Sequence, residues 1–461
     1  MNGRRIASGT LLLCLGLALG SVRAGTFTLP PKTVTTLPNG LTCVFMEKRN
    51  LPLVAVRVLV DAGAARDPQG KEGLANFTAN FLSRGTEKHD AVTLSQEIDY
   101  LGATLHATAN KETAVVSGSF LSRTLEEGMA LLEQLLVRPV FPQSEFDRLQ
   151  RQAQAQLLQM LEDPSQIANL HFDRAIYGDH PYAHSIIGTK ASVAAFTRAD
   201  AVQFYGRYYR PNGAILVMVG DFDTAAARKL VEARLGSWKR GKRKPRPKGT
   251  LKALTGRQVL LVNKPDATQT QIRIGNLGVP IGHPDEYALD VVNTVLGAGF
   301  TSRLVDILRV DKGLTYSASS RFPKLRDGGM YAIRTFTKNE TTLETVQTAL
   351  DIVRDLKTKG PSAQELEKAH NYLSGQFPKR LETYAALASR LADLEFYDLP
   401  ADYLETYQGK VRAVDMAECR RILKEYFPLQ DLRLVIVSNA EQVRADLQKV
   451  GPVTVRELDA K

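Results

Sequence analysis

Two long segments of this 461-residue chain repeat the same order of features, and this duplication constrains the fold more than any other property of the sequence. Each segment opens with a strand-like alternation, at Leu53–Val60 and at Gln269–Gly275. Each then passes through a Gly-containing loop into an apolar helical run, Gly73–Leu82 and Tyr287–Leu296. A repeat of roughly 215 residues indicates duplicated domains, because solenoid repeats have periods of about 20–50 residues.

A charged amphipathic helix is predicted near the end of each repeat, with similar openings at Phe141–Glu145 and Gly360–Glu365. Strands and long helices alternate irregularly, which favours an α+β fold with helices packed on one face of a mainly antiparallel sheet. Near the start, Leu37–Leu41 contains an Asn-Gly pair and predicts a hairpin turn.

The first residues have the order of a secretory signal peptide. Arg4 and Arg5 form a positive region, Ile6–Leu19 is apolar, and Val22–Ala24 is a small-residue cleavage site. The alternative, a membrane anchor, is disfavoured because the apolar run is shorter than the ~20 residues of a span. We expect cleavage after Ala24 and a periplasmic or secreted mature protein.

The remaining chain divides at a basic stretch. We expect a signal peptide at 1–24, an N-terminal domain at 25–238, a basic linker at 239–256 and a C-terminal domain at 257–461. The formal net charge is +11, and the lysines and arginines of residues 239–248 supply +7 of it. No aromatic residues are interleaved, which disfavours nucleic-acid binding. A solvated, Pro-broken linker is the simpler interpretation, and contact with anionic lipid head groups or cell-wall polymers stays open.

Composition argues against a disordered chain and against a disulfide-rich one. Apolar residues make up 44% and charged residues 24%, as in an ordinary globular protein and not a disordered one. Of the three cysteines, Cys14 leaves with the signal peptide, so only Cys43 and Cys419 remain. Two cysteines do not form a disulfide framework, and whether they pair cannot be decided from sequence.

Several motifs together resemble the pitrilysin/insulinase-like metallopeptidases (inverzincins), in particular the branch of the mitochondrial processing peptidase and its bacterial relatives. The matching segments run in the family's order along nearly the whole mature chain: Leu37–Leu41, Gly63–Asp67, Glu72–Thr86, Gly102–Thr108, Tyr177–Tyr182, Gly188–Thr189, Tyr208–Asn212, Val219–Asp221 and Ser302–Tyr316. The resemblance implies a clam-like pair of α+β half-shells, each made of two related subdomains, that enclose a peptide chamber.

The family's zinc motif is altered at every position that the chemistry needs. In the family, His-x-x-Glu-His places two histidines on one helical face with a glutamate that activates water, and a later glutamate completes the site. Here the matching residues are Asn76, Ala79 and Asn80, followed by Gln156 at the expected distance of 76 residues. Amides are poor zinc ligands and alanine has no proton acceptor. We therefore expect no metal, no other cofactor and no catalysis by this chain alone.

Other catalytic arrangements are not indicated. His180 and His184 have ligand-like spacing but flank Pro181 in a predicted loop, without an adjacent glutamate, so we expect His180 to cap a turn instead. There is no Gly-x-Ser-x-Gly segment, and neither Cys43 nor Cys419 lies in a catalytic motif.

The second half retains the pair that holds substrate in the resembled family. There, an arginine orients the peptide backbone, and a tyrosine seven residues later stabilises the oxyanion; Arg309 and Tyr316 match these positions. Both groups donate hydrogen bonds and can stabilise charge that develops on a carbonyl oxygen. Without the resemblance, they would be interpreted as ordinary residues of an amphipathic helix and the strand after it.

A chain with this pair but no zinc site resembles the non-catalytic subunit of a two-subunit peptidase. The resemblance implies a heterodimer with a zinc-bearing paralogous subunit and a peptide substrate. The loop at Leu296–Phe300 is short, so recognition of targeting presequences by a long glycine-rich loop is not expected. Two alternatives remain: a scaffold with no role in proteolysis, and a peptide-binding protein that accepts an extended strand at a sheet edge.

Overall fold

The N-terminal half is built from strands and helices between Thr33 and Leu235. This computed structural model describes residues 28–247 and 249–458, so the predicted signal peptide at 1–24 lies outside the described residues. The elements of this half are β1 Thr33–Thr36, β2 Thr42–Glu47, β3 Leu53–Val60, α1 Leu74–Phe81, α2 Ala91–Tyr100, β4 Thr104–Ala109, β5 Ala114–Leu121, α3 Leu125–Val137, α4 Gln143–Glu162, α5 Pro164–Tyr177, α6 Lys190–Ala194, α7 Arg198–Tyr208, β6 Ala214–Gly220 and α8 Thr224–Leu235.

The C-terminal half runs from Gln258 to Glu457. Its elements are β7 Gln258–Asn263, β8 Gln269–Leu277, α9 Glu286–Asn293, β9 Ala318–Arg321, β10 Met330–Lys338, α10 Thr342–Lys359, α11 Ala363–Gln376, α12 Tyr384–Phe396, α13 Tyr403–Arg412, α14 Met416–Tyr426, β11 Arg433–Ser438, α15 Ala440–Leu447 and β12 Val453–Glu457. Two π-helical turns, η6 Thr294–Ala298 and η7 Val305–Asp311, follow α9.

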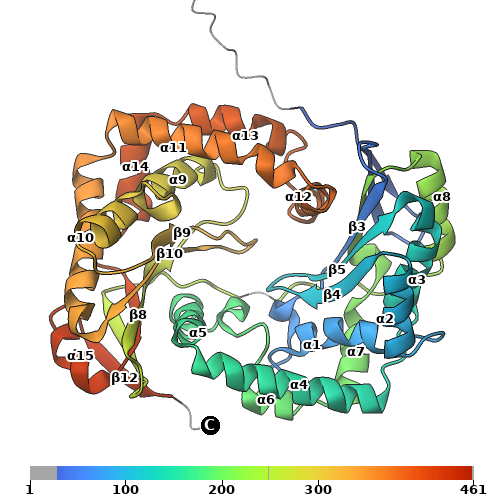
Figure 1. Cartoon of the computed structure of the whole chain (residues 1–461), viewed down its shortest axis with the longest axis horizontal. Coiled ribbons are helices and arrows are strands. Elements are labelled where there is room, and N and C mark those ends of the chain that lie inside the picture. Colours follow the sequence, from blue (N-terminus) through green and yellow to red (C-terminus); the bar gives the residue numbers. More distant parts are fainter. Residues whose placement is uncertain (1–27, 248, 459–461) are drawn as a thin grey trace, which may run out of the picture.

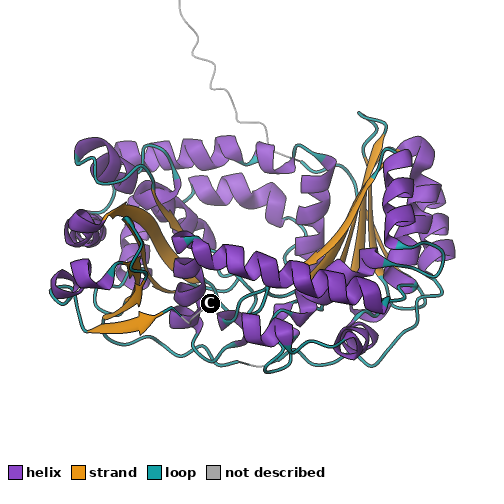
Figure 2. Cartoon of the chain, turned by 60° about the horizontal axis from the view of Figure 1, so that its bottom comes forward, coloured by secondary structure: helices purple, strands orange, loops and turns teal. Residues whose placement is uncertain are grey.

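The described residues form two six-stranded sheets, drawn as orange arrows in Figure 2, and five of the six strands follow the same topology in both, which confirms the duplicated α+β fold (Figures 1 and 2). The strand orders are β1-β2-β6-β3-β5-β4 and β12-β7-β11-β8-β10-β9. In both orders, the second and third strands pair in parallel (β2 with β6, β7 with β11), and the strands after them pair antiparallel. Each half holds a single sheet in the described residues, so the repeated unit is the half itself.

The outer strand is where the two sheets differ. β1 comes from the start of the described chain and pairs antiparallel with β2, whereas β12 comes from its end and pairs parallel with β7. The predicted hairpin at Leu37–Leu41 joins β1 to β2, with Gly40 at φ +88° in the left-handed region that favours glycine.

Each half contributes one helix to the inner face of the other half's sheet. α5 packs on β8 and β11, and α12 packs on β3 and β6 (Figure 1). Phe172 of α5 shares a buried cluster with Val437 of β11, and Leu391 of α12 shares another with Val219 of β6. Since helices from both halves cover the sheets, β3 is apolar and buried along most of its length instead of alternating.

A hydrogen-bonded group also joins the halves around Glu112, which is 8% exposed. Its carboxylate accepts hydrogen bonds from the Tyr182 hydroxyl at 2.5 Å, the Tyr397 hydroxyl at 2.6 Å and the Arg326 backbone N–H at 3.2 Å. Burial and the negative charge of Glu112 raise the pKa of Tyr397, so the phenol stays a donor. Gly63 lies against this loop, where a Cβ would be 2.2 Å from the Glu112 carbonyl carbon.

The linker is mostly exposed to solvent, and its backbone is also held against the N-terminal half. The Arg66 guanidinium donates to the carbonyl oxygen of Pro245 at 3.1 Å, and the Asn212 side chain exchanges two hydrogen bonds with the Gly241 backbone. Arg246 donates to Asp61 at 3.2 Å and lies 5.0 Å from the ring of Phe396 in the other half. Arginine and asparagine side chains thus satisfy part of the linker backbone and fix its course.

Both cysteines of the described chain are free and fully buried, Cys43 in β2 and Cys419 in α14, which settles the open question of their pairing. Burial raises the pKa of each thiol to about 12. In the part of the chain that the structure describes, no helix is both long and apolar enough to cross a bilayer.

Candidate functional site

The helix that matches the zinc motif is present as α1, and aromatic packing holds it in place. The Phe77 ring lies 5.2 Å from that of Phe146 and 5.4 Å from that of Phe196, in edge-on geometry. Ala79 is also completely buried, but two residues along the helix place it on a different side from Phe77. The packing face of the helix has therefore survived the loss of its polar motif.

Asn76 and Asn80 are four residues apart and lie on one face of α1, next to Phe77. The Asn80 Nδ2 donates to the Asn76 carbonyl oxygen at 2.8 Å and to its Oδ1 at 3.2 Å. The same Oδ1 accepts hydrogen bonds from the Ala109 backbone N–H at 3.2 Å and from the Thr108 hydroxyl at 3.3 Å. Asn76 therefore fastens α1 to the edge strand β4, a structural use of a position that would otherwise bind metal.

Three of the four predicted positions line one small cavity of about 190 Å³. Asn76 and Asn80 meet Gln156 of α4 there, together with Arg84, while Ala79 does not reach it. Burial lowers the pKa of Arg84, and the nearby Arg148 lowers it further. Among the described residues that line this cavity, none carries an imidazole, thiolate or carboxylate, and the one ionisable side chain is that of Arg84, a cation.

This donor set does not fit zinc. Zinc sites use histidine, cysteine and carboxylate ligands, and amide oxygens belong to harder ions. Throughout residues 28–247 and 249–458, no three histidine, cysteine, aspartate or glutamate side chains are grouped so that they could hold a metal ion. The cavity offers no group that could activate a water molecule, so it holds none of the chemistry of a metallopeptidase.

The His180 and His184 pair has a structural role. The His180 Nδ1 accepts a hydrogen bond from the Tyr182 backbone N–H at 3.1 Å, which confirms the predicted turn cap. The His184 Nε2 lies 3.2 Å from the Asp67 Oδ2, and Asp67 also accepts the backbone N–H groups of Gly73 and Ala75 ahead of α1. This arrangement positions the start of the helix.

Arg309 and Tyr316 lie apart from the α1 cavity, and neither lines it. Arg309 is on the π-helical turn η7, and Tyr316 is in the loop before β9 rather than in a strand. Both side chains are exposed, Tyr316 by 82%. Within the described residues neither forms a hydrogen bond or ion pair, so both remain available to an outside group.

The segment that carries this pair is anchored at both ends. Arg303 donates to both oxygens of Glu365, at 2.6 and 2.9 Å, and to Asp355 at 2.9 Å. After η7, the Thr337 hydroxyl donates to the Leu314 carbonyl oxygen at 2.8 Å. A fork of this kind is geometrically specific, so it fixes where the exposed pair is presented.

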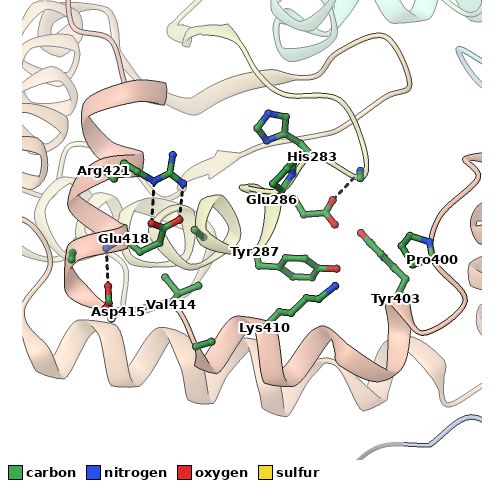
Figure 3. Close-up of a pocket in the computed structure, with 15 residues that line it drawn as sticks. His283, Glu286, Tyr287, Pro400, Tyr403, Lys410, Val414, Asp415, Glu418 and Arg421 are labelled. Carbon is green, nitrogen blue, oxygen red and sulfur yellow. Dashed lines mark hydrogen bonds and ion pairs between the residues drawn. The ribbon is translucent and has the colours of Figure 1, made fainter.

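A larger hollow of about 740 Å³ lies between α9, α13 and α14 (Figure 3). Its wall contains Glu286, only 2% exposed, which accepts the Gly282 backbone N–H at 3.2 Å. Burial and the nearby charge of Glu286 raise the pKa of Tyr287 and of Tyr403. The ammonium of Lys410 lies 5.0 Å from the Tyr287 ring. None of the residues that match the family's site lines this hollow, so we assign it no part in the candidate site.

Sequence reasoning missed Glu112 and the ion pair between Arg66 and Asp61. Arg66 donates to Asp61 at 3.0 and 2.7 Å, and both side chains are buried. In the sequence, Gly63–Asp67 is recognisable only as a segment that resembles the family. Its charged residues show no pattern that predicts an ion pair. These groups hold the halves and the linker rather than a substrate.

The fold is a clam-like pair of α+β halves. At the site, asparagine and glutamine amides stand where a metallopeptidase has its zinc ligands. The chain belongs to the insulinase (peptidase M16) family. Residues 43–190 match the family model "Insulinase (Peptidase family M16)", and residues 195–373 match "Peptidase M16 inactive domain".

Among curated relatives, the "Non-peptidase homolog YmxG" of Helicobacter pylori is 26% identical over 87% of this chain and 92% of its own length. The "Uncharacterized zinc protease YmxG" of Bacillus subtilis is 24% identical over 87% and 97%. The fold is similar to that of a solved peptidase M16 inactive domain from Pseudomonas fluorescens, with a TM-score of 0.82 and 24% identity over 93% of this chain and 100% of that one. It is also similar to that of a solved protease from Helicobacter pylori, with a TM-score of 0.84 and 22% identity over 89% of this chain and 100% of that one.

Proposed function

We propose that this chain is the zinc-free, non-catalytic subunit of a secreted heteromeric metallopeptidase, and that it holds peptide substrate for a partner bearing the zinc site. The proposal rests on one contrast within the chain: the zinc-motif positions have lost their catalytic groups, while the substrate-holding pair is retained and exposed. The cavity of the zinc motif is lined by Asn76, Asn80 and Gln156, which cannot activate water, while Arg309 and Tyr316 are presented to solvent on an anchored segment.

The chemistry assigned to the exposed pair is that of substrate holding. The Arg309 guanidinium donates to backbone carbonyl oxygens of an extended peptide, and the Tyr316 hydroxyl donates to the oxygen that becomes negatively charged during hydrolysis. A paralogous subunit with an intact His-x-x-Glu-His helix supplies the reacting centre. The partner is thus a second peptidase-family chain, and the active site forms between the two.

Export belongs to the same proposal, because residues 1–24 have the order of a signal peptide. The mature chain then starts at Gly25 and works in the periplasm or outside the cell. Mass spectrometry of the protein from its native host tests this directly. Recovery of residues 1–24 on the mature protein would contradict export by this route.

Steady-state cleavage by the reconstituted pair tests the shared active site. Arg309→Ala or Tyr316→Phe should lower kcat/KM by about one to three orders of magnitude, as expected when a charged or oxyanion hydrogen bond is lost. Association with the partner and the melting temperature should change little, because both side chains are exposed. Matched controls are Arg444→Ala and Tyr100→Phe, exposed residues on α15 and α2.

The outcomes also separate the alternatives. A peptide-binding protein is favoured by the free sheet edges at β4 and β9, each paired on one side only. It would show lost peptide affinity for Arg309→Ala without any partner. A scaffold would show unchanged kinetics and unchanged peptide affinity in both variants, and this result would end the shared-site proposal.

A further inference from the structure

The basic linker gathers its charges into one surface on the N-terminal half. We call this the basic surface, and it comprises Arg207, Arg210, Lys239, Arg240, Lys242, Arg243 and Lys244. Five of the seven line one small hollow: Arg207, Arg210, Lys242, Arg243 and Lys244. Cations from α7 and from the linker therefore meet at one place, although about 35 residues separate them in sequence.

The linker backbone is held, so this gathering is built into the fold. Asn212 exchanges hydrogen bonds with Gly241 at 2.9 and 3.2 Å, and the Arg240 guanidinium donates to the Pro38 carbonyl oxygen at 3.1 Å. The Arg210 side chain packs on Gly241, where a Cβ would lie 2.8 Å from the Arg210 Cδ. The cationic side chains are thus presented from an ordered backbone, with Lys239, Lys242 and Arg243 exposed.

No local acid balances this charge. Asp61 is the one carboxylate that lines the hollow among the described residues, and it is already engaged by Arg66 at 2.7 Å and by Arg246 at 3.2 Å. Like charges held close together repel one another unless an anion lies between them. The arrangement is therefore complementary to an anionic partner.

The shape of the basic surface favours an extended anionic surface over a small anionic ligand. The hollow has a volume of only about 20 Å³, too small to enclose a metabolite, and three of the cations that line it, Arg207, Lys242 and Arg243, are exposed. The one aromatic ring there, Tyr208, has guanidinium groups 5.1 and 5.5 Å from its centre, those of Arg66 and Arg207. No free ring face remains for stacking a base, which argues against single-stranded nucleic acid.

We propose that the basic surface binds the phosphate head groups of an anionic lipid bilayer. Clusters of four to eight lysines and arginines are attracted to anionic membranes, and each cation near the surface strengthens binding by about fivefold. The interaction is electrostatic, so it weakens as salt shortens the screening length. This inference is independent of the proposed peptidase role, because Arg309 and Tyr316 are not part of the surface.

Co-sedimentation of the chain beginning at Gly25 with vesicles tests the proposal. It should sediment with phosphatidylcholine vesicles that contain phosphatidylglycerol, not with phosphatidylcholine alone, and less as sodium chloride is added. The triple variant Lys239→Gln, Lys242→Gln, Arg243→Gln should lower the partition coefficient by about a hundredfold. The control triple Lys368→Gln, Lys424→Gln, Arg444→Gln removes the same charge from exposed positions on the other half and should lower it far less.

Three results would overturn the proposal. Equal losses in the two triple variants would show a response to net charge and no defined surface. Binding of inorganic phosphate in solution without binding to phosphatidylglycerol vesicles would assign the surface to a free anion. Absence of sedimentation at low salt, with the linker triple weakening a complex with another protein, would assign it to a protein partner.

Discussion

The hydroxyl of Tyr397 in the C-terminal half donates a 2.6 Å hydrogen bond to the carboxylate of Glu112 in the N-terminal half. The two residues are 285 positions apart in sequence, and both are largely withdrawn from solvent. Glu112 also accepts a hydrogen bond from Tyr182, so one carboxylate connects the turn at Pro181–Ala183, the β4–β5 loop and the end of α12. The two halves are thereby tied at a point remote from both ends of the chain.

Removal of the Tyr397 hydroxyl should destabilise the protein. A hydrogen bond to a charged group contributes about 1.5–3 kcal/mol, and Tyr397→Phe leaves Glu112 with one donor fewer. Urea unfolding should show a free energy of unfolding lower by that amount. Tyr100→Phe, at a tyrosine 90% exposed, is the matched control and should be neutral. Equal stability of the two variants would remove the tie between the halves.

Restoration of the zinc motif should restore metal binding. The purified wild-type chain is expected to bind no stoichiometric zinc, because its amide-lined cavity lacks ligands. Asn76→His, Ala79→Glu, Asn80→His and Gln156→Glu together should bind one zinc ion per chain by equilibrium dialysis and metal analysis. The same variant with Gln156 retained should bind more weakly. One chelator-removable zinc in the wild type would contradict this account.

Acid should weaken the anchor of the Arg309 segment. Burial alone would raise the pKa of Glu365, but its hydrogen bonds from Arg303 and Ser362 outweigh burial and lower the pKa from 4.5 to about 2. The ionised form therefore stabilises the fold above about pH 4.5, and this contribution is lost as the pH falls from 4.5 towards 2. With solvent screening, the loss is about 1–2 kcal/mol.

Urea unfolding across that pH range measures this loss. Glu365→Gln should show a flatter pH dependence than the wild type, because its side chain no longer titrates. Glu367→Gln, on the exposed side of the same helix α11, serves as the control and should retain the wild-type dependence. Identical profiles for all three proteins would show that the Arg303 pair does not contribute to acid sensitivity.

Truncation of Phe77 should be costly, because its ring contacts those of Phe81, Phe146 and Phe196 in a buried cluster. Loss of a buried phenylalanine side chain reduces the free energy of unfolding by about 3–5 kcal/mol, from lost burial and the cavity left behind. Phe300→Ala removes an 83% exposed ring and should cost little. Thermal unfolding compares them, and a small effect at Phe77 would mean that α1 is not held by this cluster.

The local part of the site could be predicted from the sequence because it is encoded by regular spacing. Asn76 and Asn80 are four residues apart and share a helical face, whereas Gln156 on α4 is identified only through the resemblance to the family's motif. The structure places all three around one cavity. Ala79 differs because it points into the core, where a methyl group has no contact with the cavity.

The contacts between the halves could not be predicted in this way. The apolar face of α12 is visible in the sequence, but nothing in its periodicity says that it covers β3 and β6 of the other half. Glu112 and Tyr397 meet only once that packing is complete. The π-helical turn of Arg309 has no residue signature either, since its wider turns use ordinary side chains.

Because Cys43 and Cys419 are buried in different halves, their reaction with a thiol reagent can report the opening of each half separately. Cys43 is in the core of one half and Cys419 in the core of the other, and with a pKa of about 12 neither is a competent nucleophile in the folded state. In a chain that starts at Gly25, the labelling rate of Cys43 therefore reports how often the N-terminal half opens, and the labelling rate of Cys419 reports how often the C-terminal half opens. Equal labelling rates would describe a molecule that opens as a unit, and unequal rates would identify the half that yields first.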